Sequence, residues 1–224
     1  MVYVTILTMI QILTIPVTSY QQNCRIVVDD ETNEAVCIDP GGDILSVLAV
    51  LPPSVALSAI WITHSHIDHV SGVAELLSST ESPLSVMAHA DDVVNRRFLS
   101  QQSAMMRFPY SGEFEVTHHV SHYDSLTVGN HSFQVLHTPG HAIGHVSYFM
   151  EDATNIYQRP ILIAGDALFK GSIGRTDLPG GNHDLLIKSI KDHLFVLPDE
   201  TIVCSGHGPN TTIGHEKKTN PFFL

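Results

Sequence analysis

The sequence predicts an α/β domain in which sheets pack in the middle and helices cover them on the outside. Two observations predict it: short apolar segments separated by turn residues recur along the chain, and helix-like segments alternate with the later ones. No repeat and no Pro- or Ser-rich linker divides the 224 residues, so we expect one domain over residues 1–224. A chain of this length that is 43% hydrophobic can bury a full core without disulfides.

The predicted elements follow from local composition. Strand-like runs are rich in Val, Ile and Thr, and turn residues such as Pro40-Gly41-Gly42 and Pro139-Gly140 bound them. Early strands are joined by short turns, whereas later ones alternate with helices. The predicted strands lie near residues 9–17, 24–29, 35–39, 57–63, 84–88, 125–128, 132–137, 145–150, 160–165 and 201–205. The predicted helices lie near residues 42–51, 70–80, 90–105 and 182–195.

The N-terminal segment 1–17 carries no charged side chain. A signal peptide normally has Lys or Arg before its apolar run and a small-residue cleavage site after it, and neither is evident. The run is also too short to span a bilayer comfortably, so we expect no membrane contact. Its Ile, Val and Thr content favours a buried strand from Met9 onward, while residues 1–8 could extend that strand or form a loose leader.

Charge and cysteine content restrict partners and compartment. With 11 basic and 23 acidic residues the net charge is −12, which disfavours nucleic acid as a partner. An anionic substrate would need a local positive centre, which bound metal would supply. The three cysteines, Cys24, Cys37 and Cys204, form no disulfide framework and no CxxC pair, so we expect a cytoplasmic protein.

Several predicted strands end directly in histidine or aspartate. In open α/β sheets, ligand sites lie where strands end and loops begin, so these ends are expected to meet in one cavity. The residues are His64 after Trp61-Ile62-Thr63, His137 and His141 after Val135-Leu136, Asp166 after Leu162-Ile163-Ala164, and His207 after Ile202-Val203.

The densest of these ends is His64-Ser65-His66-Ile67-Asp68-His69. In an extended chain His64 and His66 point the same way, because side chains alternate with period two. Asp68 and His69 then lie in the turn that opens the next helix, and they face a second point beside the one that His64 and His66 face. Imidazole and carboxylate without thiolate suit zinc, iron or manganese in catalytic sites.

This segment resembles the HxHxDH signature of the metallo-β-lactamase fold hydrolases. The later motifs Thr138-Pro139-Gly140-His141, Gly165-Asp166 and Gly206-His207-Gly208 follow in the family's order, so the resemblance runs from about residue 10 to the C-terminus. It implies an αββα sandwich of two mixed sheets and a pair of divalent ions, zinc first, with iron or manganese as alternatives. By the same resemblance, one ion is held by His64, His66 and His141, the other by Asp68, His69 and His207, and Asp166 is shared.

Within that family the chain looks closest to short bacterial glyoxalase II-like hydroxyacylglutathione hydrolases. Three stretches support this resemblance: Asp39-Pro40-Gly41-Gly42, residues 168–177, and Gly206-His207-Gly208-Pro209 with the tail Asn220-Pro221-Phe222. The helical C-terminal domain of longer glyoxalases II is missing, so hydrolysis is better supported than the glutathione substrate. Arg175, after Gly174, looks like the family's glutathione-carboxylate ligand, since its planar fork binds carboxylate bidentately. Lys170 is a weaker substrate-binding candidate.

The expected reaction is hydrolysis of a small anionic thioester, an S-acylglutathione. Two ions about 3.5–4 Å apart would share a hydroxide that attacks the thioester carbonyl, with Asp68 and Asp166 as catalytic carboxylates. The alternative is a persulfide dioxygenase, a family of similar fold with one iron, held here by His64, His141 and Asp166. A non-catalytic metal-binding module, a lactonase and a β-lactamase stay open, because a fold does not determine its substrate.

Other histidines have separate interpretations. We expect His118, His119 and His122 at the surface, because little carboxylate surrounds them, and His183 at a helix start. His137 and His145 could orient a metal ligand or simply pack in the core. Residues 91–110 could form an amphipathic lid or pocket wall, or a helix packed on the core.

Overall fold

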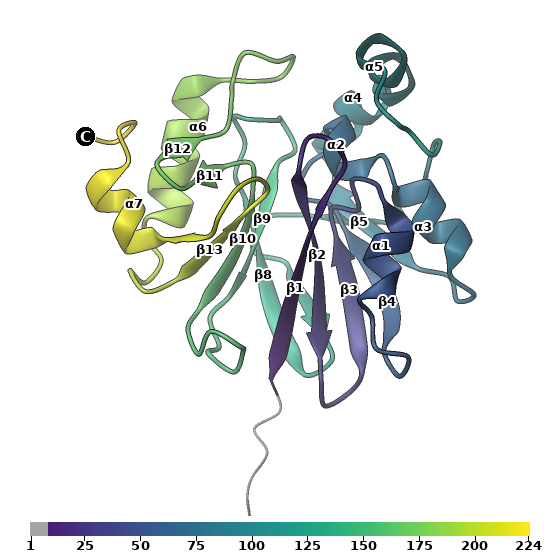
Figure 1. Cartoon of the computed structure of the whole chain (residues 1–224). Coiled ribbons are helices and arrows are strands. Elements are labelled where there is room, and N and C mark those ends of the chain that lie inside the picture. Colours follow the sequence, from purple (N-terminus) through teal and green to yellow (C-terminus); the bar gives the residue numbers. More distant parts are fainter. Residues whose placement is uncertain (1–8) are drawn as a thin grey trace, which may run out of the picture.

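The structure is a computed structural model, and residues 9–224 of it are described. The expectation for residues 1–8 therefore lies outside the described residues. Two six-stranded sheets pack against each other in the middle, and helices lie on their outer sides (Figure 1). The α/β sandwich predicted from the sequence is confirmed.

The first sheet contains the strands of the N-terminal half in chain order. The first three pair antiparallel through short turns, and the next three add in parallel, which requires crossover segments. The strands are β1 (Ile10–Val17), β2 (Gln22–Asp29), β3 (Glu34–Ile38), β4 (Ala56–Trp61), β5 (Ser85–His89) and β6 (His118–Val120). The crossovers contain α1 (Ile44–Ala49), α2 (Ile67–Val70), α3 (Val73–Ser79), the 3₁₀ helix η1 (Ala90–Asp92), α4 (Val93–Arg96) and α5 (Leu99–Met106).

The second sheet has the order β14-β13-β10-β9-β8-β7, and only β10 and β13 run parallel. Its strands are β7 (Ser125–Val128), β8 (His131–His137), β9 (Val146–Met150), β10 (Ile161–Gly165), β13 (Ile202–Ser205) and β14 (Thr211–Thr212). A small hairpin of β11 (Leu168–Phe169) and β12 (Ser172–Ile173) follows β10. The helices on this side are α6 (His183–Ser189), the π-helical turn η2 (Ile190–Leu194) and α7 (Ile213–Thr219).

The core consists of three apolar layers, one between the sheets and one under the helices on each side. Along β2, Ile26 and Val28 belong to the helix-side layer and Val27 to the layer between the sheets, as strand alternation requires. In that middle layer Trp61 meets Phe133 edge-on with ring centroids 5.5 Å apart. The Tyr148 hydroxyl donates to the Ile62 carbonyl over 2.8 Å and so joins the two sheets.

The structure differs from the prediction mainly in the helices. The helix expected over 70–80 is divided into α2 and α3 around Gly72, where a Cβ would lie 2.8 Å from the Pro40 carbonyl oxygen. Close packing of these loops therefore outweighs local helix propensity. The sequence does not predict five short elements, β6, β11, β12, β14 and α7, because each is too short to show a periodic pattern.

The strands that end near each other carry the polar residues identified above. β4 of the first sheet and the parallel pair β10 and β13 of the second end at the same region of the sandwich. The backbone N–H of Asn23 donates to the Gly206 carbonyl over 2.7 Å and holds the two halves together there. Within residues 9–224, no helix has the length and apolarity needed to cross a bilayer.

Phe133→Ala tests the layer between the sheets. The side chain is fully buried against Trp61, so its removal leaves a cavity and should lower the free energy of unfolding by about 3–5 kcal/mol. Phe98→Ala is the matched control: this ring is 49% exposed, and the loss should stay below about 1 kcal/mol. Denaturant unfolding measures both, and equal losses would contradict the assigned core.

Candidate metal centre

Four loops bring seven histidine and aspartate side chains to one place between the two halves of the sandwich. Within groups of three, the ligand-type atoms lie within 4.8 Å of one another. The groups are His64, His66 and His141; His64, His69 and Asp166; and Asp68, His69 and His207. The structure therefore brings together all seven side chains that the sequence predicts as metal ligands.

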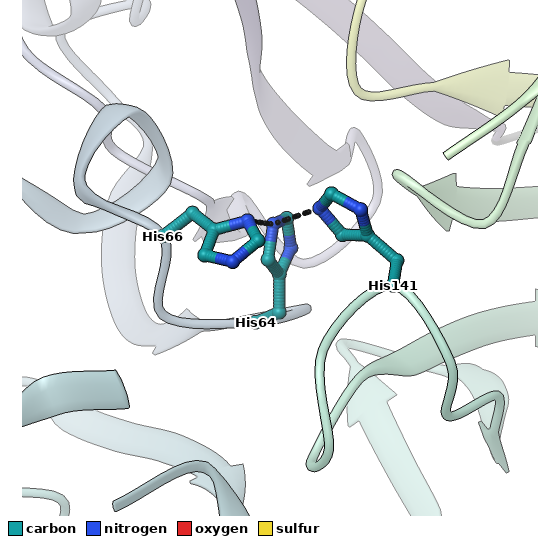
Figure 2. A group of neighbouring side chains, drawn as sticks. All are labelled: His64, His66 and His141. Atoms are coloured by element: carbon teal, nitrogen blue, oxygen red, sulfur yellow. Dashed lines mark hydrogen bonds between the residues drawn. The ribbon is translucent and has the colours of Figure 1, made fainter. Parts of the chain in front are cut away.

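The first group consists of three imidazoles. His64 and His66 leave the end of β4, and His141 comes from the loop after β8 (Figure 2). The Nε2 atom of His64 lies 3.0 Å from Nδ1 of His66 and 3.1 Å from Nε2 of His141. Three ring nitrogens thus converge on one point, as the alternation of an extended His64-Ser65-His66 segment predicts.

The second group combines one carboxylate with two imidazoles. Asp68 and His69 lie in α2, and His207 follows β13. The Oδ2 atom of Asp68 is 3.1 Å from Nε2 of His207 and 3.9 Å from Nε2 of His69. Asp68 and His69 lie in the helical turn and form a group next to the first, as predicted, and the rings of His69 and His64 have centroids 4.2 Å apart.

Asp166 lies between the two groups. Its Oδ2 is 3.6 Å from Nε2 of His141 in the first group and 3.7 Å from Nε2 of His207 in the second, and its Oδ1 is 3.4 Å from Nε2 of His69. Two of these buried atoms, Asp166 Oδ1 and His69 Nε2, have no hydrogen-bond partner. Unpaired buried polar atoms are costly, and a cation between them would satisfy both.

In three of the ligand histidines the second ring nitrogen, Nδ1, contacts an oxygen atom. Nδ1 of His69 contacts Asp39 Oδ2 at 2.9 Å, Nδ1 of His141 contacts the Arg175 carbonyl at 2.7 Å, and Nδ1 of His207 contacts the Tyr20 carbonyl at 3.2 Å. A carbonyl or an ionised carboxylate only accepts, so each Nδ1 carries the proton. Each Nε2 therefore faces inward, and in the neutral ring it holds the lone pair that binds a metal.

Asp39 connects both groups, although the sequence singles it out only as part of Asp39-Pro40-Gly41-Gly42. It is buried and accepts from the Thr63 N–H at 2.7 Å and the Thr63 hydroxyl at 2.6 Å, in addition to His69. Since the Thr63 hydroxyl gives its proton to Asp39, it accepts from Nδ1 of His64 at 3.1 Å. One carboxylate therefore orients His69 directly and His64 through Thr63.

His145 and His137, left open by the sequence, have different roles. His145 is fully buried; its Nε2 accepts from the Asp166 N–H at 3.0 Å, and its Nδ1 lies 2.8 Å from the Thr138 hydroxyl. It therefore positions the backbone of Asp166. His137 instead stacks on His89 with ring centroids 4.2 Å apart and reaches the Ile143 carbonyl at 3.2 Å.

The remaining histidines lie outside the site. His118 and His119 are exposed on the edge strand β6, as predicted, and His183 is the first residue of α6, where the Asn182 side chain accepts from the Leu185 N–H. His122 is only partly buried and contacts His193, with ring centroids 4.5 Å apart.

The electrostatics of the two groups differ. Burial, with the neighbouring imidazoles, lowers the pKa of His66 to about 3 and the pKa of His64 well below its ordinary value. Burial also opposes protonation of His69 and His207, but the carboxylates of Asp166 and Asp68 outweigh it and raise both pKa values. The first group is therefore neutral and ready to bind a cation, and the second requires positive charge beside its carboxylates.

The two predicted substrate-binding residues both have exposed side chains. Arg175 is exposed, and its guanidinium forms a two-point ion pair with Asp177, with contacts of 2.7 and 2.8 Å. The main-chain carbonyl of Arg175 accepts a hydrogen bond from His141. A Cβ on the preceding Gly174 would lie 3.0 Å from the His141 ring, so glycine allows the backbone to lie this close to the ring. Lys170 is exposed between β11 and β12. Their contact with a substrate stays a prediction.

These residues fit divalent cations. The donors are nitrogen and oxygen atoms, the ring tautomers direct lone pairs inward, and two buried atoms have no other partner. Cys24, Cys37 and Cys204 are buried and free, and none belongs to the site. Zinc, iron and manganese all accept this donor set.

Asp39→Asn tests whether Asp39 orients the histidines of the metal centre. An amide at this position would present an N–H to His69 and favour the wrong tautomer, so metal affinity should fall about 10–100-fold. Competition with a chelating dye, read with elemental analysis, measures the change. Asp192→Asn, an exposed carboxylate paired with Lys188, is the control and should bind metal like the unaltered protein. Unchanged affinity in Asp39→Asn would contradict the proposed role.

Comparisons with known proteins agree with this geometry. The sequence pattern of the Metallo-beta-lactamase superfamily matches residues 17–207. Hydroxyacylglutathione hydrolase GloC of Haemophilus influenzae is 35% identical over 220 residues, covering 93% of this chain and 95% of that protein. The crystal structure of the BLEG-1 B3 metallo-beta-lactamase has a TM-score of 0.83 and 37% identity, covering 95% of this chain and 99% of that one. TTHA1623, crystallised in a di-iron-bound form, has a TM-score of 0.81 and 35% identity, covering 94% and 99%. This chain belongs to the metallo-β-lactamase superfamily.

Proposed function

We propose that this protein is a metal-dependent hydrolase of thioesters and that its substrates are S-acylglutathiones. The observation that carries the proposal is the position of Asp166, with one carboxylate oxygen 3.6 Å from a ligand-type nitrogen of one group and 3.7 Å from one of the other. A carboxylate placed in this way can bridge two cations. Two-cation sites of this kind serve hydrolytic displacement.

The substrate class is supported by similarity and by charge. GloC, named a hydroxyacylglutathione hydrolase, matches nearly the full length of both chains. The chain carries a net charge of −12, so an anionic substrate needs a local positive centre. Two divalent ions among these ligands would supply one. The di-iron form of TTHA1623 supports iron beside zinc and manganese as the native metal.

The chain's own residues perform the positioning in this mechanism. When bound, two divalent cations lower the pKa of a water and polarise the thioester carbonyl. Asp39, through His69 and Thr63, and His145, through the Asp166 backbone, keep the inner nitrogens and the shared carboxylate in place. Of the two carboxylates, Asp68 is the less buried and is our candidate to accept a proton from water. The water oxygen joins the carbonyl carbon, the C–S bond breaks, and a thiol of pKa about 8.5 leaves with little need of a general acid.

The alternative, a one-iron persulfide dioxygenase, would use only His64, His141 and Asp166. It leaves Asp68, His69 and His207 without a cation, and Nε2 of His69 would stay buried and unpaired. This observation favours the two-cation hydrolase. β-Lactam hydrolysis is a further outcome to measure, since BLEG-1 is named a metallo-beta-lactamase.

His66→Ala and Asp166→Ala test the catalytic centre. Each removes a predicted ligand, so kcat/KM for S-lactoylglutathione, followed by loss of thioester absorbance, should fall at least about a thousandfold. The melting temperature of the metal-free protein should change little, and the exposed His118→Ala should keep full activity. One iron per chain with oxygen uptake and no thioester loss would refute the hydrolase.

Arg175→Ala and Lys170→Ala test the substrate-binding prediction. If these side chains contact the glutathione carboxylates, KM should rise about three- to tenfold with kcat nearly unchanged, since the lost contact is uniform binding. Arg159→Ala, another exposed arginine, is the control. An unchanged KM in both variants would place the thiol part of the substrate elsewhere.

A further inference from the structure

A cavity lies at the outer edge of the first sheet, apart from the metal centre. It is about 590 Å³ in volume and is formed by η1, α4, the start of α5, the loop 110–116 and His119 of β6. We call it the edge cavity. His119 pairs in register with Ala88, whose side chain belongs to the helix-side core, so the edge cavity opens on the helix side of the sheet. Its volume is typical of small-molecule sites.

The walls combine apolar side chains with two guanidinium groups. Val93, Leu99, Phe114 and Val116 supply the apolar part, and Arg96 and Arg97 are the cations. The Nη1 atom of Arg96 is buried and makes no hydrogen bond. The buried Asp92 attracts the Arg96 guanidinium from beyond ion-pair distance. Within the described part of the chain, no carboxylate oxygen lies within 4 Å of either guanidinium, although Arg175, Lys188 and Lys217 each pair with an aspartate.

A guanidinium with a buried, unpaired N–H is a site for an anion. Arginine binds carboxylate with two parallel hydrogen bonds, and a partly dry wall strengthens them. Glu113 and Glu115 also line the edge cavity, and both are exposed. Their charge balances that of the two arginines and disfavours polyanions such as nucleotides, so a ligand held by the Arg96 guanidinium would carry no more than one negative charge. The apolar walls then require an apolar body on the same ligand.

We infer that the edge cavity binds a monocarboxylate with an apolar chain, its carboxylate on Arg96 and Arg97 and its chain against Val93, Leu99 and Phe114. The site is separate from the metal centre, because the buried Asp92 lies between them. On the far side of Asp92 is the loop of His141, where a Cβ on Gly144 would come within 2.4 Å of the Asp92 nitrogen. The inference does not depend on the reaction proposed above.

Octanoate titrated into the metal-loaded protein tests this inference by calorimetry. We expect one saturable site, with acetate and octylammonium binding far more weakly, because the first lacks the chain and the second the negative charge. Arg96→Gln combined with Arg97→Gln should weaken octanoate binding at least about tenfold, since hydrogen bonds to a charged group are lost. Arg107→Gln, at the end of α5 and outside the edge cavity, is the matched control and should bind normally.

Two further variants separate the possible outcomes. Val93→Trp should fill the edge cavity and abolish octanoate binding while both arginines are present. This variant tests the inference even if the double variant folds poorly. His66→Ala should bind octanoate normally. Absence of a saturable site, or octanoate binding as tight in the double variant and in Val93→Trp as in the unaltered protein, would overturn the inference. Loss of binding in His66→Ala alone would also overturn it, because the carboxylate would then lie on the metals.

Discussion

The carboxylate of Asp166, buried between two groups of imidazoles, is the constraint on which the rest of the site depends. An ionised carboxylate in such a place is tolerated only when positive charge and hydrogen bonds surround it. Neighbouring imidazoles, His69 first, lower its pKa even though burial acts in the opposite direction. The protein therefore holds a negative charge where a cation completes the structure, and the surrounding residues serve to hold it there.

Rigid support for this arrangement comes from both halves of the sandwich. Asp39 at the end of β3 acts from the first sheet, and His145, just before β9, acts from the second. Gly165, with φ +50°, ends β10 so tightly that a Cβ would lie 2.7 Å from the Thr63 hydroxyl and 2.6 Å from His145. Such contacts restrict the side chains that carry the inner nitrogens to a single orientation, which is what a preorganised site requires.

The positive charges of this acidic chain are distributed unevenly. Several are neutralised at the surface, as in the pairs Arg175–Asp177 and Lys188–Asp192. Arg96 and Arg97 form no ion pair of this kind within the described residues and instead line the edge cavity, whose walls are partly polar and partly apolar, on the other side of Asp92. The same segment, η1 and α4, thus separates two places suited to anions: the bound cations would attract one, and the guanidinium groups the other.

The sequence alone determined the fold class, nearly every strand of the two sheets and the seven ligand-type residues, because strand alternation and the residues at strand ends are local properties. It did not reveal that Asp39 orients His69, 30 positions away, or that His145 holds the backbone of Asp166, 21 positions away. It also did not predict that Arg175 would pair with Asp177, or that Arg96 would face a cavity without a hydrogen-bond partner for Nη1. Those features arise only when distant segments pack together, because a contact between two distant side chains leaves no periodic pattern in the sequence.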